Sequence, residues 1–332
     1  MYAPPRPPAA ARSHPDKGAL IKTSARRTSL LLVSPVLLAL ALALGWAGSA
    51  VGAASGSSRP VAAVGAESEY ANVIGQIGGR YVTVKAIETN PNTDPHSFEA
   101  SPSVANEIAA AQLVVQNGLG YDSYMDRIES ASPSRTRRVI DVQKLLRLPD
   151  STSNPHLWYA PTTMPTVAKA IAADLSALLP ADASYFTANV AAFDRSLNPW
   201  LAALRAVASR YPHTPVAVTE PVGDYMLAAA GAQILTPFTF QADVMNGVDA
   251  APQDLTFEQS LLSQHRVKLL LYNQQVTDSL TASFLAAARK YGIPVVGAYE
   301  TMPAGYTYQS WMLAEAGAVH NAIANGTSTQ KL

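Results

Sequence analysis

Two histidines and two glutamates in this chain of 332 residues lie where parallel α/β folds place their chemistry. His96 lies in the loop after the predicted strand "VTVKAIE", and His156 lies in "NPHLWYAP", before a helical pattern. Glu220 ends the predicted strand "VAVTE", and Glu300 ends "VVGAYE". Imidazole nitrogen and carboxylate oxygen are suitable ligands for first-row divalent metals. The four residues are 60, 64 and 80 positions apart, so the fold must bring them together.

Each of these residues also has an ordinary structural explanation. A loop histidine such as His96 is usually solvated or hydrogen bonded, and His156 could cap the helix that follows it. Glu220 could be a strand-end carboxylate near the positive end of a helix dipole. The aromatic runs "LWY" and "YTYQSW" favour packing, and they could also wall the site from water. Three further histidines are expected at the surface: His213, His265 and His320.

Two predicted lobes must position these residues. Short β-branched runs alternate with long alanine-rich helical patterns, which is typical of parallel strands joined by helical crossovers. One helical pattern runs from about Asp182 to Arg210 and contains Pro199, where we expect a kink. We therefore predict an α/β fold with two βα lobes, each with a parallel sheet, joined by one long backbone helix. Ligands of such sheets bind at the carboxyl ends of the strands, so we place a metal site in the cleft between the lobes.

Local signals define the ends of several predicted elements. The glycine pair at 78–79 ends one helix, and Ser101 is placed to cap the next one. Pro91 and Pro95 restrict the backbone on either side of the segment that leads to His96. The stretch "TPFTFQADVMNGVDAAPQ" has low charge and is predicted as a connector.

The first 59 residues are typical of a targeting segment. Basic residues in "KTSARRTS" precede the apolar run "LLLVSPVLLALALALGW" and the small residues "AGSAVGAASGSS". Cleavage after Ala53 and retention as an uncleaved anchor both remain open, because about 17 apolar residues are the lower limit for a spanning helix. In either case we expect an exported protein, in the periplasm or on the outer face of the cytoplasmic membrane. The expected division is a signal or anchor segment with linker at 1–59, an N-terminal metal-binding lobe at 60–180, a connecting helix at 181–210, and a C-terminal metal-binding lobe at 211–332.

The composition excludes several function classes. Lys and Arg number 24 against 24 Asp and Glu, so bulk charge gives no attraction to nucleic acid or to acidic lipid. The chain has no cysteine, which excludes disulfides, thiolate metal sites, thiol nucleophiles and a lipid-bearing cysteine. Any metal must be bound through nitrogen and oxygen.

The chain resembles the solute-binding proteins of zinc and manganese ABC importers, the cluster whose lobes are joined by a rigid backbone helix. "NPNTDPHSFEASPSVANEIAAAQLVVQNGLGYDSYM" looks like the first-ligand signature of that family, and "NPHLWYAPTTM" looks like the second. The resemblance extends from about Val61 to Ala324.

The resemblance implies four metal ligands. His96 and His156 match the two histidine ligands of the amino-terminal lobe, and Glu220 falls on a third position that is glutamate in typical manganese members. The fourth position is an aspartate in the family. The sequence at this position is "AYETMPAG", where Glu300 is the nearest carboxylate. Asp278 or a bound water are the alternatives for the fourth ligand. A set of two histidines and two carboxylates leans towards manganese, and zinc remains open because it binds more tightly at most such sites.

The implied function is that of a binding module without catalysis. The chain would capture one divalent metal ion, Mn²⁺ or Zn²⁺, as transported ligand and present it to the membrane permease subunits of an ABC importer, as a monomer. One alternative is a zinc-dependent hydrolase, because three protein ligands plus water form a catalytic arrangement. Against it, the sequence has no HExxH helix, no G-x-S-x-G elbow and no P-loop. A metal-binding surface adhesin or storage protein would use the same site.

Overall fold

The computed structural model describes residues 59–332, which belong to one compact unit. Its first half contains a parallel sheet in the order β2-β1-β3-β4. The strands are β1 (Val61–Glu67), β2 (Val82–Glu88), β3 (Leu113–Gln116) and β4 (Arg138–Asp141). The helices of this lobe are α1 (Ser68–Gly78), α2 (Pro102–Ala110), α3 (Ser123–Ala131), α4 (Val142–Leu145) and α5 (Thr163–Leu178).

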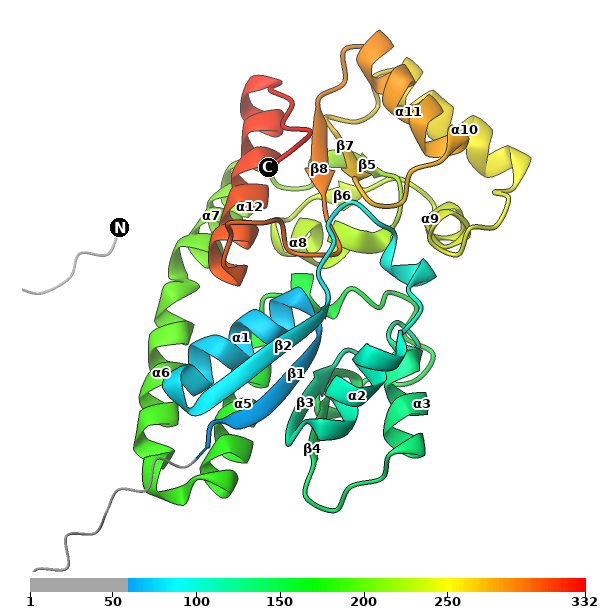
Figure 1. Cartoon of the computed structure of the whole chain (residues 1–332). Coiled ribbons are helices and arrows are strands. Elements are labelled where there is room, and N and C mark those ends of the chain that lie inside the picture. Colours follow the sequence, from blue (N-terminus) through cyan, green and yellow to red (C-terminus); the bar gives the residue numbers. More distant parts are fainter. Residues whose placement is uncertain (1–58) are drawn as a thin grey trace, which may run out of the picture. The chain divides into compact units, whose positions relative to one another are not determined.

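The second half repeats this arrangement with a sheet in the order β6-β5-β7-β8, again parallel throughout. The strands are β5 (Pro215–Val218), β6 (Gln233–Ile234), β7 (Leu270–Asn273) and β8 (Val295–Ala298). The helices are α8 (Asp224–Ala229), α9 (Phe238–Met245), α10 (Pro252–Ser263), α11 (Ser279–Lys290) and α12 (Tyr308–Asn325). The predicted α/β fold with two parallel-sheet lobes is therefore confirmed (Figure 1).

Sequence explains why the strands take these places. β3 and β7 lie inside their sheets and are buried along their whole length, as expected for strands covered on both faces. β2 is an edge strand, and its exposed and partly buried residues alternate over the first four positions. The predicted helix stop is also observed, since α1 ends at Gly78 and Gly79 takes a positive φ of 51°. Ser101 accepts a hydrogen bond from the amide of Val104 and so caps α2.

The predicted single backbone helix is two consecutive helices, α6 (Ala183–Ser196) and α7 (Asn198–Arg210). Pro199 is the second residue of α7 and has no N–H to donate to the carbonyl four residues before it. The helical hydrogen bonds restart from the carbonyl of Leu197, which accepts from the amide of Leu201 at 3.0 Å. α6 packs on α1 and α5, and α7 packs on α8 and α12, so the pair lies along both lobes (Figure 1).

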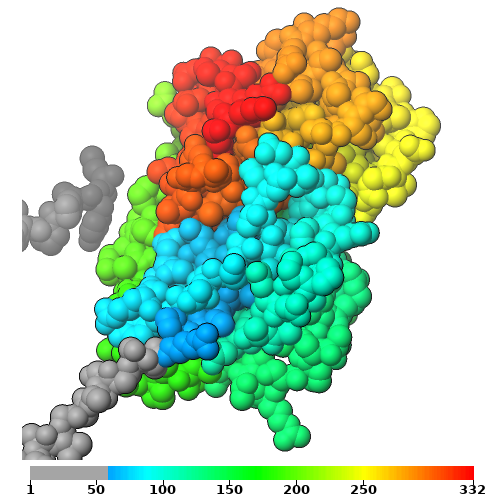
Figure 2. All heavy atoms as spheres, in the orientation of Figure 1, coloured from blue at the N-terminus to red at the C-terminus, as the bar shows by residue number. Residues whose placement is uncertain are grey.

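One hydrophobic core extends through both lobes. It contains Ile74 and Val115 from the first half together with Val218 and Trp311 from the second. Aromatic hydroxyls add polar contacts across the same boundary, because Tyr308 donates to the carbonyl of Trp158 at 2.6 Å. In the space-filling view the cyan segment that follows β2 lies directly against orange residues of the second half (Figure 2).

The stretch predicted as a connector contains a helix, α9. Its low charge and its flanking Pro and Gly residues favoured a loop, but Phe240 and Val244 are buried one helical turn apart. The predicted signal or anchor segment, residues 1–59, lies outside the described residues except for Arg59. No helix within residues 59–332 is both long and apolar enough to cross a membrane.

We expect Glu258→Gln to flatten the dependence of stability on pH. Glu258 on α10 is 0% exposed, and burial raises the pKa of its carboxyl from 4.5 to about 8. Between these two values the folded chain binds more proton than the unfolded chain, so the free energy of unfolding falls as pH rises through this window, by at most about 1.4 kcal/mol per pH unit. The neutral amide removes this contribution. Urea unfolding from pH 5 to pH 9 measures the free energy of unfolding, with Glu99→Gln at an exposed position as control. If this free energy depends on pH equally in wild type and in Glu258→Gln, the raised pKa of Glu258 is contradicted.

Candidate metal centre

His96 lies in a short 3₁₀ turn, Pro95–Ser97, in the loop between β2 and α2. The carboxylate of Asp94 caps this turn by accepting the backbone N–H of His96 at 2.8 Å. Pro95 is buried and fixes φ at the first position of the turn. The imidazole of His96 keeps 22% of its surface exposed. Pro95 therefore restrains the backbone at His96, as predicted, and the Asp94 cap adds a second local restraint.

His156 precedes a second 3₁₀ turn, Leu157–Tyr159, and its side chain is completely buried. It does not cap α5. Instead the side-chain oxygen of Asn154 lies 3.0 Å from its backbone nitrogen and 2.9 Å from ring atom Nδ1. The amide nitrogen of Asn154 donates to the carbonyl of Pro221 in the other lobe at 2.8 Å. Asn154 therefore orients the imidazole and joins it to the segment that carries Glu220.

Glu300 follows β8 and is completely buried between the lobes. Its Oε1 accepts from the side chain of Asn273 at 2.6 Å, and its Oε2 accepts from the hydroxyl of Tyr121 at 2.9 Å. Its backbone N–H donates to the side-chain oxygen of Gln275 at 2.7 Å. The position of this carboxylate is therefore set by residues from both lobes.

The two imidazoles and the Glu300 carboxylate converge. Oε2 of Glu300 lies 3.2 Å from Nε2 of His96 and 3.1 Å from Nε2 of His156. Among the described residues this is the one group of three such side chains whose ligand atoms lie within 4.8 Å of one another. The spacing suits neighbouring ligand atoms around a first-row divalent ion at about 2.0 to 2.2 Å. The site is built from the carboxyl ends of strands of both sheets, as the parallel topology predicts.

Hydrogen bonding assigns the protons of the His156 ring. Because Asn154 turns its amide nitrogen to Pro221, its oxygen faces the ring, and Nδ1 must carry the hydrogen. In the neutral ring Nε2 then presents a lone pair to Oε2 of Glu300, which is itself an acceptor. Two acceptors at 3.1 Å repel each other unless the ring is protonated or a cation binds both.

Electrostatics requires positive charge at this centre. Burial lowers the pKa of His156, against the opposing hydrogen bond and charge of Glu300. Burial acts on His96 in the same direction, but the hydrogen bond and charge of Glu300 outweigh it and raise the pKa. Burial acts to raise the pKa of Glu300, yet the charges and hydrogen bonds of His156 and His96 hold it well below its usual range. The Glu300 carboxylate therefore stays ionised because positive charge lies beside it, and either a protonated imidazole or a divalent cation can supply that charge.

Glu220 lies close to this group but outside it. It precedes the turn Pro221–Gly223, is 0% exposed, and neither of its carboxylate oxygens has a hydrogen-bond partner among the described residues. Burial raises the pKa of Glu220 well above its usual value, and the charge of Glu300 raises it further. A buried carboxylate without a partner is costly, and a cation beside it would remove that cost.

The alternative residues have other roles. Asp278 caps α11, since its carboxylate accepts from both the amide and the hydroxyl of Thr281 in a capping box. His213 and His265 are exposed, whereas His320 on α12 is partly buried, with its ring 6.0 Å from that of Tyr211. None of the four belongs to the group of converging ligands among the described residues.

Sequence reasoning missed Tyr121, Asn154, Asn273 and Gln275. Tyr121 follows β3, so the strand-end rule could have found it; its ring packs edge-on against His96 and His156, with centroids 5.1 and 5.8 Å away. Trp158 packs against His156 at 5.5 Å and is fully buried. Of the two aromatic runs, "LWY" contributes Trp158 to a wall beside His156, and Tyr121 extends it, whereas Tyr308 and Trp311 of "YTYQSW" pack against other aromatic residues.

Comparison with known proteins gives a consistent result. The model of the family described as zinc-uptake complex component A, periplasmic, matches residues 64–322. The zinc-binding protein TroA of Treponema pallidum is 27% identical over 184 residues, covering 53% of this chain and 58% of TroA. The manganese-binding lipoprotein MntA of Bacillus subtilis is 25% identical over 137 residues, covering 40% of this chain and 44% of MntA. The chain thus spans roughly half the length of each of these two relatives.

Solved structures share the fold. The periplasmic zinc-binding protein TroA of Treponema pallidum superposes with a TM-score of 0.68 at 18% identity, covering 81% of this chain and all of that one. The solute-binding protein FpvC of Pseudomonas aeruginosa in complex with Mn²⁺ gives a TM-score of 0.65 at 21% identity, covering 81% of this chain and all of that one. The arrangement of two lobes is therefore common to these chains.

We expect Asn154→Ala to release the His156 ring from its Nδ1-protonated form. The variant removes the acceptor for both the ring and the backbone N–H of His156. Long-range ¹⁵N–¹H spectra of the imidazoles then show the His156 nitrogens moving towards a mixture of tautomers. Asn189→Ala, which removes a side-chain bond to the carbonyl of Ile77 away from the site, is the matched control. Unchanged His156 shifts in Asn154→Ala would refute the assignment.

Proposed function

The chain belongs to the family of the periplasmic zinc-uptake component A, and from this premise we propose that it captures Mn²⁺ or Zn²⁺ outside the cytoplasm for import. The metal is the transported ligand and not a resident cofactor. The importer that receives it is proposed to be an ABC transporter, whose membrane permease subunits take the ion from this chain.

The observation that carries the proposal is the facing pair of acceptors at His156 and Glu300. The ring of His156 donates from Nδ1 to Asn154, so in the neutral ring the Nε2 lone pair faces the Glu300 carboxylate oxygen 3.1 Å away. His96 points its Nε2 at the same oxygen from the neighbouring loop. A divalent cation bound by these atoms replaces the repulsion with three coordinate bonds.

We assign the metal ligands as His96, His156 and Glu300, with Glu220 as the fourth. Glu220 is included because it is fully buried beside Glu300 with both oxygens unpartnered, so a small shift on closure around the ion gives it a ligand's role. Two carboxylates and two imidazoles form a harder set than three imidazoles, which supports manganese, while zinc competes through its higher intrinsic affinity.

The family description and the basic, apolar N-terminal sequence support export to the periplasm or to the outer face of the cytoplasmic membrane. We propose that residues 60–180 and 211–332 act as the two metal-binding lobes, with 181–210 as the connection between them. The chain is proposed to act as a monomer and to bind and deliver the ion without catalysis.

Metal content and affinity test the assignment. We expect protein purified without added metal to hold one Mn²⁺ or Zn²⁺ per chain by mass spectrometry. His96→Ala, His156→Ala and Glu300→Ala should each weaken affinity by more than about 100-fold, because loss of a direct ligand exceeds the 10- to 100-fold effect of its supporting residues. Competitive titration of Mn²⁺ against Zn²⁺ measures both affinity and preference.

The matched control is His320→Ala, which removes a histidine outside the site and should leave affinity unchanged. Glu220→Gln separates the fourth ligand from the other three, since the amide keeps the size of the side chain and loses its charge. Wild-type protein that binds neither ion, or ligand variants that bind as well as wild type, would overturn the proposed function.

A further inference from the structure

The side chain of Gln275 makes four hydrogen bonds beside the metal centre, and the one to Thr93 joins the two lobes. It follows β7, its side chain is 4% exposed, and its Oε1 accepts the backbone N–H groups of Glu300 and Thr301 at 2.7 and 2.8 Å. Its Nε2 donates to the hydroxyl of Thr301 at 3.1 Å and to the backbone carbonyl of Thr93 at 2.8 Å. One amide group therefore holds Glu300 in one lobe and the loop of His96 in the other.

The loop of His96, residues 90–99, is otherwise held mainly by itself. Thr93 bonds back to Asn90 through its amide and hydroxyl, and Ser97 bonds back to the carbonyl of Asp94. Within the described part of the chain, the bond from Gln275 is the one hydrogen bond that the backbone of this segment receives from outside it. Loss of that bond leaves the turn intact and removes the backbone attachment of this segment to the other lobe, so that the His96 side chain, with its contact to Glu300, is what still joins the two.

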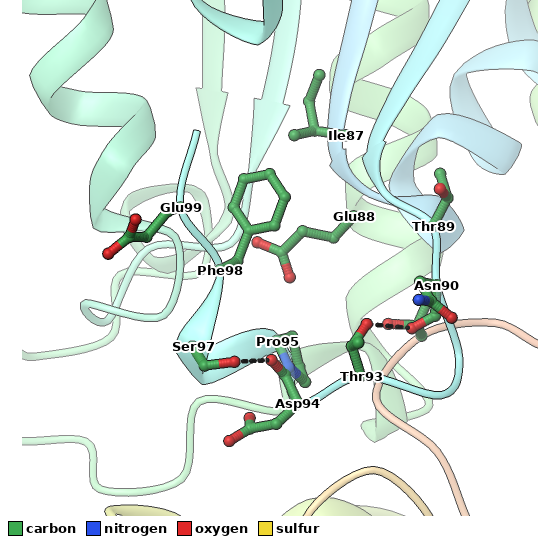
Figure 3. A pocket seen from close by; sticks show the side chains of 11 residues that line it. Ile87, Glu88, Thr89, Asn90, Thr93, Asp94, Pro95, Ser97, Phe98 and Glu99 are labelled. Atoms are coloured by element: carbon green, nitrogen blue, oxygen red, sulfur yellow. Dashed lines mark hydrogen bonds between the residues drawn. The ribbon is translucent and has the colours of Figure 1, made fainter. Parts of the chain in front are cut away.

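Behind the loop lies a cavity of about 380 Å³. Figure 3 shows the loop passing along one side of it, with the side chains of Glu88 and Phe98 directed into the space. The pocket is partly open to solvent, so displacement of the loop into it breaks fewer packing contacts than displacement into a close-packed interior would. The loop has room to move without unpacking the core.

Exposure shows where an ion can pass. His156, Glu220 and Glu300 are each 0% exposed, whereas the His96 side chain keeps 22% of its surface exposed. An ion leaving the centre must therefore pass the side on which His96 lies. Displacement of the His96 loop opens this side, and it also breaks the bond between Thr93 and Gln275.

We propose that Gln275 is a positioning residue that latches the His96 loop to the Glu300 segment and thereby sets the rate at which bound metal leaves. This inference rests on the proposed metal-binding function. The amide acts through geometry alone, because its Nε2 holds the loop closed while its Oε1 holds the Glu300 backbone in place. Because the same side chain makes both contacts, opening of the loop also loosens the backbone of Glu300.

The test measures metal dissociation in Gln275→Met, which keeps the volume of the side chain and removes all four hydrogen bonds. Wild type and variant are loaded with Mn²⁺ or Zn²⁺, mixed with excess chelator in a stopped-flow instrument, and followed to completion. We expect dissociation to accelerate about three- to tenfold, the range for loss of one or more net hydrogen bonds. Gln241→Met is the matched control, because Gln241 is also buried in the second lobe and donates to the carbonyl of Thr236 away from the centre.

Hydrogen–deuterium exchange separates the latch from general destabilisation. Gln275→Glu keeps acceptors for the amides of Glu300 and Thr301 but presents an oxygen to the carbonyl of Thr93. We expect faster exchange in peptides covering residues 90–99 for both Gln275→Met and Gln275→Glu, with unchanged exchange there for Gln241→Met. The second variant keeps the test decisive if Gln275→Met does not fold.

The outcomes are distinct. If wild type binds metal and Gln275→Met releases it no faster than Gln241→Met, the latch is refuted while the proposed function stands. If exchange of residues 90–99 is unchanged in Gln275→Glu, the loop is held by something other than this bond and the inference also fails. If wild type binds neither ion, the proposed function fails first.

Discussion

The contacts around the Glu300 carboxylate are the constraint on which the site depends. A single ionised group, completely buried, is held by Asn273 and Tyr121 while two imidazoles point at it. An isolated buried charge is costly, so these partners offset the cost of burying the Glu300 carboxylate where the lobes meet. The packing of the lobes therefore brings Tyr121 of the first lobe and Asn273 of the second to the buried charge of Glu300.

Much of the fold and part of the site could be predicted from the sequence. Alternation of β-branched and alanine-rich segments indicated two parallel sheets, and the family model confirms the resemblance read from the segments around His96 and His156. The strand-end rule selected the side chains that meet in the cleft because topology alone brings these ends together. Ligation by the four residues stays a prediction.

Other features could not be predicted, for physical reasons. Asn154 and Gln275 act through tertiary hydrogen bonds across the lobes, and nothing in their local sequence distinguishes them from surface amides. The break between α6 and α7 was foreseen only as a kink, because the pattern shows a proline but not how far its missing hydrogen bond disrupts the helix. Glu220 follows a strand, as the strand-end rule requires, yet it lies outside the group of converging ligand atoms. Whether such a side chain reaches a metal depends on its exact position, which the spacing of residues in the sequence does not determine.

The hydrophobic core that runs through both lobes has a thermodynamic consequence. Because the halves share buried side chains, they are expected to melt together in one cooperative transition and not as two domains. A ligand held between them then stabilises the entire folded region by an amount that grows with the logarithm of its free concentration. If the proposed site binds its ion, the melting temperature of this chain rises with the supply of free metal, because each tenfold rise in free ion above the dissociation constant adds about 1.4 kcal/mol to the free energy of unfolding.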